Sequence, residues 1–269
     1  MLVNGKQKKL ISIRDRGLLY GDGVFRTLLS SRGQALHWSL HYQKIQHDCA
    51  TLGIACPSNA ALSAELNKLL SQYPDAVLKL IVTRGQGRRG YMPDTHTKPT
   101  HIWDVSEHPE LPTDAISYGV KVRWCQLRLG TQSRLAGVKH LNRLENVLAA
   151  GEVGGEGFEE GLLMDSSGNV ISGTRSNLFI VHRGNLITPN LSLCGVSGVQ
   201  RDRICNWAAQ HNIPVQIRDI RKDEVLGADE SFLVNSVIGL WPIGELESQK
   251  WTSFPVTMRI RHDLFVEIE

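Results

Sequence analysis

A succession of short apolar runs separated by turn signals fills most of residues 120–235, and this pattern restricts the fold more than any other feature of the chain. Apolar or β-branched runs bounded by Gly, Asn, Asp and Ser are typical of strands joined by tight turns. We therefore expect strands at 120–126, 161–164, 170–172, 177–181, 186–188, 215–220 and 230–234, arranged mainly as antiparallel meanders. Helical spacing of apolar residues predicts helices at 198–211 and 258–268.

The N-terminal part of the sequence has a different pattern, in which two amphipathic helices accompany the strands. The Asn4-Gly5 pair between short apolar runs predicts a hairpin with strands at 1–3 and 9–13. Ser39 is a suitable N-cap for a helix at 39–52, and Gly53 is a suitable stop for it. A second helix is expected to follow from Ser58, over 58–73. Further strands are expected at 76–82 and 100–105. Helices set apart from mainly antiparallel strands indicate the α+β class.

The segment SEHPELPTD, residues 106–114, carries two prolines among polar residues, which favours a boundary between two compact parts. With 269 residues the chain is long enough for two domains. We predict a smaller N-terminal domain at 1–110, an interdomain linker at 111–119 and a larger C-terminal domain at 120–269.

The charge and cysteine content exclude several classes of protein. The net charge is only +3, and the basic residues are interspersed with acidic ones, so a nucleic-acid backbone is not the expected partner. The five cysteines form neither a CxxC pair nor a metal-ligand spacing with histidine, which argues against a metal site and suits a reducing compartment. No apolar run reaches the roughly 18 residues of a membrane span. We expect a soluble, cytoplasmic protein.

The stretch LAGVKHLNRLENVLAA, residues 135–150, contains the lysine that is the best candidate for chemistry, Lys139. Leu141, Leu144, Val147 and Leu148 recur after it at helical spacing, which predicts a helix with this apolar side buried. A lysine held at the start of such an element is a candidate for covalent catalysis. The alternative is a solvated surface lysine at a helix start, which is the commoner situation for lysine.

Three other places can bind an anion. Gly198 in VSGVQRD, residues 196–202, precedes a helix whose free N–H groups and dipole suit a phosphate. Asn235 and Ser236 follow a buried strand and offer an amide and a hydroxyl. Lys44, on the helix predicted at 39–52, offers a point charge. Each has an ordinary explanation as well, namely a glycine helix start, a strand-ending turn and a solvated lysine.

A lysine and a phosphate cradle together are what pyridoxal 5'-phosphate chemistry requires. The lysine amine forms a Schiff base with the cofactor aldehyde, the cradle fixes the phosphate, and the ring withdraws electrons from a carbanion. The sequence offers candidates for both parts, and the resemblance described next implies pyridoxal 5'-phosphate as the cofactor.

Five stretches together resemble the fold-type IV pyridoxal-phosphate enzymes, the group of branched-chain aminotransferases, D-amino-acid aminotransferases and aminodeoxychorismate lyases. They are GDGVFRTL at 21–28, KHLNRLENVLAA at 139–150, SGTRSNLF at 172–179, LITP at 186–189 and GVSGVQRD at 195–202. The stretch RLAGVKHLNRLENVL, with TRGQGRRGY upstream, is most similar to the lyases of the group. The resemblance implies a smaller N-terminal α/β sandwich and a larger C-terminal domain built on a β-barrel-like sheet with flanking helices.

The resemblance also assigns roles to residues. It makes Lys139 the Schiff-base lysine, which would act as general base and then as general acid. The other residues expected to hold the cofactor are Lys44, Ser172, Asn177, Gly198, Val199, Gln200, Asn235 and Ser236.

Two of these residues depart from the pattern of the group. Lys44 stands where the group has a phosphate-binding arginine, which keeps the charge and loses the bidentate fork. Ser172 stands where most of the group has a glutamate that pairs with the pyridine nitrogen. A hydroxyl can only hydrogen-bond to that nitrogen, so the ring would withdraw electrons less strongly. A weaker electron sink hinders a full aminotransferase cycle more than a lyase reaction that forms an aromatic product.

The implied activity is a lyase reaction that converts 4-amino-4-deoxychorismate into 4-aminobenzoate and pyruvate in folate biosynthesis, linked to an aminodeoxychorismate synthase. The substrate is a dicarboxylate, so cationic side chains are expected near it. The candidate substrate-binding residues are Arg26, Arg84, Arg88, Arg89 and Tyr91. For each arginine the alternative is a solvated basic loop.

Two other functions remain open on the sequence. One is an aminotransferase of the same fold that acts on branched-chain or D-amino acids, against which Ser172 counts. The other is a non-enzymatic protein that binds the cofactor or a small anion without turnover, which only the departures at Lys44 and Ser172 favour. The resemblance further implies a homodimer.

Overall fold

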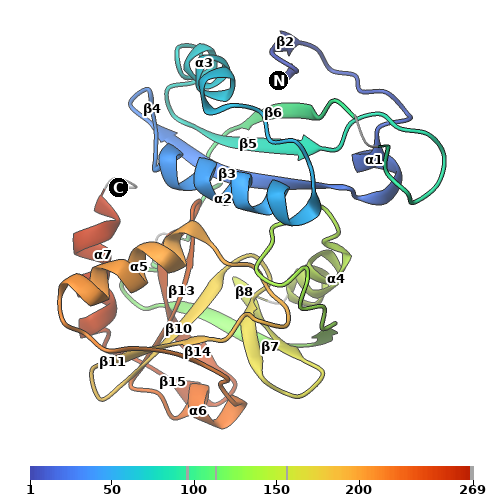
Figure 1. Cartoon of the computed structure of the whole chain (residues 1–269). Helices are drawn as coiled ribbons and strands as arrows, with labels where there is room; N and C mark the ends of the chain where they lie inside the picture. Colours follow the sequence, from blue (N-terminus) through green and yellow to red (C-terminus); the bar gives the residue numbers. More distant parts are fainter. Residues whose placement is uncertain (95–96, 113, 156, 267–269) are drawn as a thin grey trace. The chain divides into compact units, whose positions relative to one another are not determined.

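The computed structural model describes residues 1–94, 97–112, 114–155 and 157–266. It divides into two compact units (Figure 1). Unit 1 consists of Met1–Pro109 and the short segment Val138–Asn142, and unit 2 consists of Glu110–Gly137 and Arg143–Glu269. The region predicted as a linker, 111–119, groups with unit 2. The return of 138–142 to unit 1 was not anticipated from the sequence.

Unit 1 is built on an antiparallel sheet with the strand order β2-β1-β6-β5-β3-β4. The strands are β1 (Leu2–Val3), β2 (Lys6–Gln7), β3 (Gly23–Ser31), β4 (Gln34–Ala35), β5 (Ala76–Thr83) and β6 (Thr100–Ser106). The strand predicted at 9–13 is wrong. Asn4 and Gly5 both have positive φ and form a two-residue turn, so the returning strand starts at once, with Lys6 paired to Val3.

Two long helices supply the other half of the unit 1 core (Figure 1). The helices of this unit are α1 (Arg16–Tyr20), α2 (Trp38–Leu52) and α3 (Asn59–Leu70). Helix α3 follows Ser58 and α2 ends at Gly53, which has a left-handed conformation, both as predicted. Ser58 caps α3 by accepting a hydrogen bond from the Ala61 amide. The predicted N-cap of α2, Ser39, is wrong by two residues, because His37 turns the chain with a positive φ.

Unit 2 contains a mixed sheet with the order β12-β11-β10-β13-β14-β7-β8-β9, and β15 pairs with β14. Its strands are β7 (Val120–Leu129), β8 (Glu160–Asp165), β9 (Val170–Gly173), β10 (Asn177–His182), β11 (Asn185–Pro189), β12 (Val215–Arg218), β13 (Glu230–Asn235), β14 (Gly239–Leu246) and β15 (Gln249–Lys250). The sheet curls, so that β9 approaches β10 and β11. This agrees with the barrel-like sheet expected for the larger domain, and the two units together confirm the α+β class.

The expectation of antiparallel meanders in unit 2 is only partly correct. The β10–β11, β10–β13 and β13–β14 pairs are antiparallel, whereas β7–β8, β11–β12 and β14–β7 are parallel. Parallel neighbours need a long crossover connection, and helices α4 and α5 lie in two of those connections. Strand β14 was not predicted, because Pro242 and Gly244 interrupt its apolar pattern.

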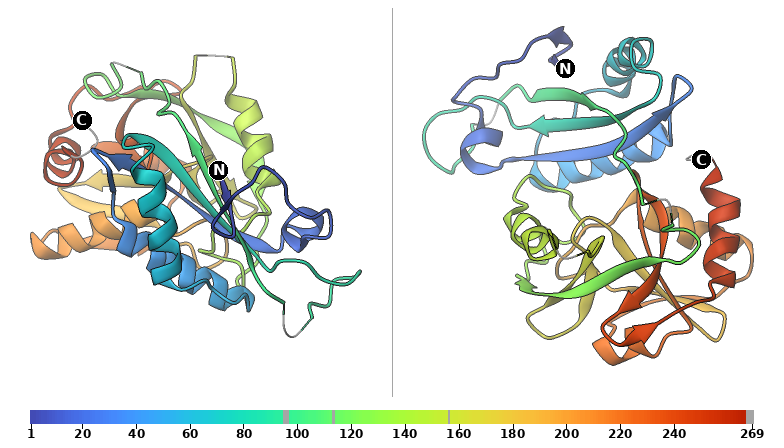
Figure 2. Two further views of the ribbon diagram at one scale, coloured as in Figure 1. Left: turned by 90° about the horizontal axis from the view of Figure 1, so that it is seen from above. Right: turned by 180° about the vertical axis from the view of Figure 1, so that it is seen from behind.

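The helices of unit 2 are α4 (Leu144–Val153), α5 (Val199–Gln210), α6 (Lys222–Leu226) and α7 (Pro255–Leu264). Helices α5 and α7 lie side by side and pack on β10 and β13 through an apolar cluster that includes Phe179 and Phe232 (Figures 1 and 2). None of the helices in the described ranges has both the length and the apolar character needed to cross a bilayer.

Helix α4 corrects one prediction directly. It packs against β7 and β8 through Ala149 and Val153. The side expected to be buried is instead open to solvent, because Leu144, Val147 and Leu148 are 75%, 63% and 63% exposed. The helix thus has two apolar sides, and in the single chain only one of them is covered.

Candidate functional site

Lys139 lies in an extended segment of unit 1, and three groups of that unit hold it. Its backbone N–H donates to Oδ2 of Asp48 on α2 at 3.2 Å. Its carbonyl accepts a hydrogen bond of 3.0 Å from the Phe25 amide on β3. The side-chain nitrogen lies 4.7 Å from the centre of the Phe25 ring, a cation–π distance. The backbone of Lys139 is therefore fixed by two hydrogen bonds, and its side-chain nitrogen contacts an aromatic ring. The lysine does not lie at the start of α4, which begins at Leu144.

The acceptor Asp48 is itself buried and paired. It is 1% exposed, and its Oδ2 also accepts a hydrogen bond from the guanidinium of Arg26, which is 2% exposed. Arg26 was predicted to bind a substrate carboxylate. Because Asp48 already engages its guanidinium in the core of unit 1, that prediction gains no support from these contacts.

Lys44 lies on the same side of α2 as Asp48 and His41. The three residues are spaced at helical intervals of three and four, which places them on one face of the helix. His41 and Asp48 are buried on this face, and Lys44 is half-buried. The predicted phosphate-binding cation and the acceptor for the Lys139 amide thus come from one helical stripe.

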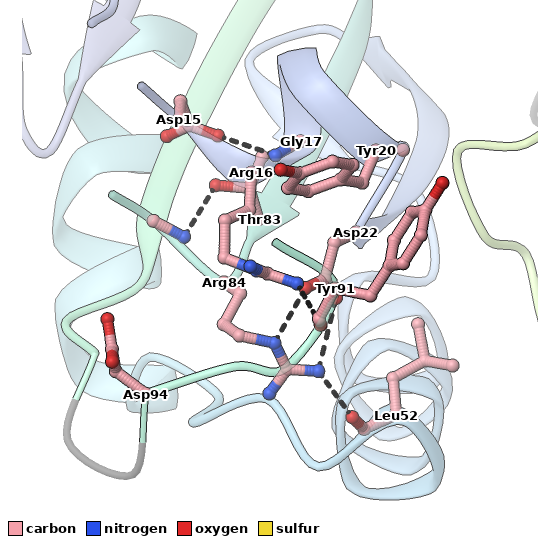
Figure 3. A network of polar contacts seen from close by, with 12 residues as sticks. Asp15, Arg16, Gly17, Tyr20, Asp22, Leu52, Thr83, Arg84, Tyr91 and Asp94 are labelled. Atoms are coloured by element: carbon pink, nitrogen blue, oxygen red, sulfur yellow. Dashed lines mark hydrogen bonds and ion pairs between the residues drawn. The ribbon is translucent and has the colours of Figure 1, made fainter. Parts of the chain in front are cut away.

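A second group of buried charges lies where β3 begins, at Asp22 (Figure 3). Asp22 Oδ2 accepts from Nε of Arg16 at 2.8 Å and from Nε of Arg84 at 2.7 Å. Arg84 also donates to the carbonyls of Leu52 and Gly53, at 2.7 Å and 2.6 Å. Burial raises the pKa of Asp22, but the hydrogen bonds and charges of the two arginines outweigh it and hold that pKa below its ordinary value. Arg84 was also predicted to bind the substrate. In the structure its guanidinium connects the start of β3 to the end of α2.

The remaining predicted substrate residues lie at the tip of the loop after β5. Arg88 and Arg89 are exposed, and Arg88 pairs with Asp94 at 2.7 Å. Tyr91 is 87% exposed, and its ring lies 5.5 Å from that of Tyr20. Arg16 holds the middle of this loop, because its guanidinium donates to the carbonyls of Gly90 and Tyr91. The loop thus presents cationic and aromatic side chains next to a backbone segment that Arg16 fixes.

In unit 2, Asn177 joins the start of β10 to the start of α5. Its side-chain oxygen accepts from the Gly198 amide at 3.1 Å, and its side-chain nitrogen donates to the Val196 carbonyl at 2.8 Å. A Cβ at position 198 would lie 2.4 Å from the Asn177 oxygen, so a side chain here would displace the Asn177 amide from its two hydrogen bonds. These contacts explain why the sequence needs both residues.

The start of α5 has the properties of an anion site. Gly198 caps the helix without a side-chain hydrogen bond, so helix geometry leaves the first N–H groups, at Val199 and Gln200, pointing outward. Such N–H groups, together with the helix dipole, bind phosphate well. Asn177 thus lies against the start of α5, next to Gly198, Val199 and Gln200.

The chain between the predicted cofactor residues Ser172 and Asn177 is a tight turn that Glu160 holds. Both carboxylate oxygens of Glu160, which is 1% exposed, accept hydrogen bonds, among them those from the hydroxyls of Thr174 and Ser176. The Ser172 hydroxyl, by contrast, hydrogen-bonds to no other residue in the described part of the chain. Its hydrogen-bonding capacity remains available to a ligand.

Asn235 and Ser236 form the turn after β13. The Asn235 side-chain oxygen accepts from the amides of Val237 and Ile238, both at 2.8 Å, and its nitrogen donates to the Arg175 carbonyl at 3.2 Å. This amide therefore shapes the turn and joins it to the turn at 173–176. Strands β10 and β13 are paired, with Asn177 opposite Val234. The two turns and the start of α5 therefore lie together at the same end of these two strands.

The residues at this end of β10 and β13 fit a phosphorylated ring with a polar nitrogen. The helix start has no side-chain cap, and the buried Ser172 hydroxyl has no hydrogen-bond partner among the described residues. Free N–H groups and a free hydroxyl are the donors that such a ligand needs. Sequence reasoning missed Asp48, Phe25 and Glu160. The only available signal was a charge placed on an otherwise apolar face, as Arg26 is between Val24 and Leu28.

The fold and these groups define a class of protein. Residues 23–246 match the model of the amino-transferase class IV family, and the chain belongs to this family. The match spans both units and includes Lys139 and the α5 start.

Individual relatives narrow the comparison. The chain is 32% identical to an aminodeoxychorismate lyase of Vibrio harveyi over 97% of this chain and 98% of the relative. It is 31% identical to a putative branched-chain-amino-acid aminotransferase of Methanocaldococcus jannaschii, over 89% and 83%. Among solved structures, 4-amino-4-deoxychorismate lyase from Pseudomonas aeruginosa superposes with a TM-score of 0.93 at 40% identity, covering 98% of this chain and 97% of that one.

Proposed function

We propose that this chain is a pyridoxal-phosphate-dependent lyase that converts 4-amino-4-deoxychorismate into 4-aminobenzoate and pyruvate. The observation that carries the proposal is the likeness to the Pseudomonas aeruginosa lyase, which extends over nearly the whole chain. The held position of Lys139 and the anion-binding start of α5 support the same conclusion from this chain's own residues.

In the proposal, Lys139 binds the same cofactor molecule as the residues at the end of β10 and β13. The backbone of Gly137, two residues before Lys139, exchanges hydrogen bonds with Gly195 and Ser197, in the loop that leads into α5. The amides of Val199 and Gln200, with Ser236 and Lys44, would hold the phosphate. Ser172 would face the ring nitrogen.

The chemistry needs one group that moves a proton. The bound cofactor supplies a ring that withdraws electrons from the substrate carbon bearing the amine. The Lys139 nitrogen would take the proton from C4 of the substrate while the bond between C3 and the ether oxygen breaks and releases enolpyruvate. Lys139 would then give a proton to the methylene carbon of the enolpyruvate, which leaves as pyruvate. The Phe25 ring beneath this nitrogen would keep it over the reacting atoms.

Substrate recognition is assigned to the loop after β5. Arg88 and Arg89 would meet the two carboxylates, and Tyr91 would line the opening. Arg26 and Arg84 are largely buried in their pairs with Asp48 and Asp22, whereas Arg88 pairs with Asp94 at an exposed position. We therefore propose structural roles for Arg26 and Arg84.

A spectrum and a product assay test the proposal. The pure protein should absorb in the violet when loaded with pyridoxal phosphate, and Lys139→Ala should lose this band. Lys79→Met is the matched control, because the Lys79 nitrogen also lies over the Phe25 ring, at 5.0 Å, and should keep the band. With chorismate, glutamine and an aminodeoxychorismate synthase, the wild-type protein should form 4-aminobenzoate. A protein that binds no cofactor would overturn the proposal.

An aminotransferase is the second candidate, favoured by the Methanocaldococcus jannaschii relative. It requires that the ring nitrogen stay protonated, for which Ser172 offers no carboxylate. Loaded protein that makes no 4-aminobenzoate, but transfers the amine of a branched-chain or D-amino acid to 2-oxoglutarate, would establish this alternative instead.

The proposal includes a homodimer. The exposed apolar side of α4, formed by Leu144, Val147 and Leu148, is the surface that a second copy would cover. Sedimentation should give twice the mass of 29.9 kDa for wild type and a lower mass for Leu144→Glu/Leu148→Glu. Ile217→Glu, at an exposed position of an edge strand, is the control and should stay dimeric. The cytoplasmic location expected from the sequence stays a prediction.

A further inference from the structure

Arg26 is an unusual residue for its place in the fold. It lies on β3 between Val24 and Leu28, whose side chains are completely buried in the apolar core of unit 1. Strand residues two apart face the same side, so Arg26 points into the same core. There it meets Asp48, which α2 places beside the buried Cys49. A charged pair therefore occupies a position where two apolar side chains would fit.

Such a pair contributes little to stability. Burying two charges costs more free energy than their attraction returns unless further hydrogen bonds satisfy them, and apolar replacements are often as stable. Here the Asp48 Oδ1 atom accepts no hydrogen bond within the described residues. A pair built for stability would use that oxygen.

The other oxygen of Asp48 has a second task. Oδ2 accepts the N–H of Lys139 at 3.2 Å, 91 positions further along the chain. The Lys139 carbonyl is held by the Phe25 amide, and Phe25 is the neighbour of Arg26 on β3. The charged pair therefore completes the backbone support of the one lysine to which the proposed function assigns chemistry.

We propose that Asp48, oriented by Arg26, is a positioning residue that fixes the backbone of Lys139. This inference rests on the proposed function for the role of Lys139, but not for the contact itself. Arg26 fixes the carboxylate, and the carboxylate fixes the amide through a hydrogen bond that carries a full negative charge. The Lys139 nitrogen then has fewer orientations to search, which is how a supporting group raises the rate without touching the substrate.

The decisive variant is Arg26→Met/Asp48→Leu. It removes both charges together, so no lone charge stays buried and the chain should fold. The measurement is hydrogen exchange of the Lys139 amide in the cofactor-free protein, labelled with 15N-lysine. Exchange should quicken about tenfold, the equivalent of one net hydrogen bond. Glu65→Gln is the matched control, because Glu65 is also buried and pairs with His101 at 2.8 Å, and none of its hydrogen bonds or ion pairs with described residues involves Lys139. Its Lys139 amide should exchange at the wild-type rate.

Enzymatic measurements separate positioning from a merely structural role. For Arg26→Met/Asp48→Leu, kcat should fall about tenfold or more with KM nearly unchanged, because the substrate-binding loop is intact. Attachment of pyridoxal phosphate, trapped with borohydride and counted by mass, should slow by a similar factor. Arg26→Gln/Asp48→Asn keeps an acceptor for the amide without charge and should recover part of the loss.

The outcomes distinguish the two proposals. Unchanged Lys139 exchange in Arg26→Met/Asp48→Leu would overturn the positioning role whatever the activity. If that variant fails to fold, Arg26→Met/Asp48→Ala, which removes the same acceptor with a smaller side chain, decides by the same exchange measurement. A wild-type protein that borohydride never labels at Lys139 would instead refute the proposed function, and the exchange result would still decide whether Asp48 holds the amide.

Discussion

Two buried carboxylates, one in each unit, support the predicted cofactor residues in opposite ways. Asp48 in unit 1 is balanced by a cation, Arg26, and leaves one oxygen without a hydrogen bond. Glu160 in unit 2 is balanced mainly by neutral donors, and both of its oxygens accept hydrogen bonds from the turn at 173–176. The distant guanidinium of Arg175, 3.7 Å away, is largely exposed.

The difference shows how each carboxylate achieves its effect. Glu160 is a hub for backbone and hydroxyl donors that lie within three residues of one another, so it shapes a local turn. Asp48 joins three segments that are far apart in the chain, β3, α2 and the segment at Lys139. Donors from a single turn let the Glu160 carboxylate stabilise that turn. The cation from another strand lets the Asp48 carboxylate connect separate elements. Variants of both residues test this distinction.

The largest effect is expected for Arg26→Met. It leaves Asp48 charged and unpaired in the core, which should lower the free energy of unfolding by about 3–5 kcal/mol. Urea unfolding measures the loss. Arg26→Met/Asp48→Leu should recover most of it, and a single variant as stable as wild type would show that Asp48 does not depend on its cation.

Glu160→Gln should cost less, about 1.5–3 kcal/mol, because one oxygen becomes an NH₂ group facing donors while the other still accepts. No cation is left behind in the core. Glu159→Gln, the neighbouring and less buried position, is the control and should cost under about 1 kcal/mol. Equal losses at the two positions would mean that the turn does not need the Glu160 charge.

Ser176→Ala removes one neutral donor from Glu160, a hydrogen bond of 2.9 Å. The expected loss of stability is about 1 kcal/mol, since the other donors remain. The thermal midpoint should fall by roughly 2–4 °C on the scale of a chain of this size. A loss as large as that of Glu160→Gln would show that this single donor, rather than the set, holds the turn.

Asp22 extends the comparison to a carboxylate with two cations, and its effect should be confined to acid pH. Its pKa is lowered in the folded protein from the ordinary value of 3.8, so its contribution is complete above that value and is lost as the pH falls through the folded pKa. The stability difference between wild type and Asp22→Asn should therefore be constant near neutral pH and shrink below about pH 3.8. A difference that grows on acidification would contradict the assignment.

Much of the fold was predictable because it depends on local signals. Helix α3 begins after its serine cap, β5 and β10 follow their apolar runs, and Gly53 ends α2. The start of α5 was predictable for the same reason, because Gly198 directly precedes residues with helical spacing. Period and capping are properties of neighbouring residues, and the sequence displays them directly.

The unpredicted features depend on pairing across the chain. The Arg26–Asp48 and Arg84–Asp22 pairs join residues 22 and 62 positions apart, and no local signal distinguishes these arginines from ligands for a substrate. The prediction that the Leu144 side of α4 is buried was wrong for a related reason. Helical spacing identifies an apolar face but does not show which element covers it. Parallel pairing in unit 2 was missed since register between distant strands is set only when the sheet forms.

The segment Val138–Asn142 has a consequence for cutting the molecule apart. Val138 is buried in the unit 1 core, and Phe25 and Gly23 pair with the backbone of Lys139 and Leu141, although both flanks of the segment belong to unit 2. A fragment that stops at Pro109 would thus be an incomplete half, with a vacant slot beside β3. A peptide carrying residues 138–142 could fill this slot in trans, so the boundary visible in the structure is not a place where the gene could be divided into two autonomous modules.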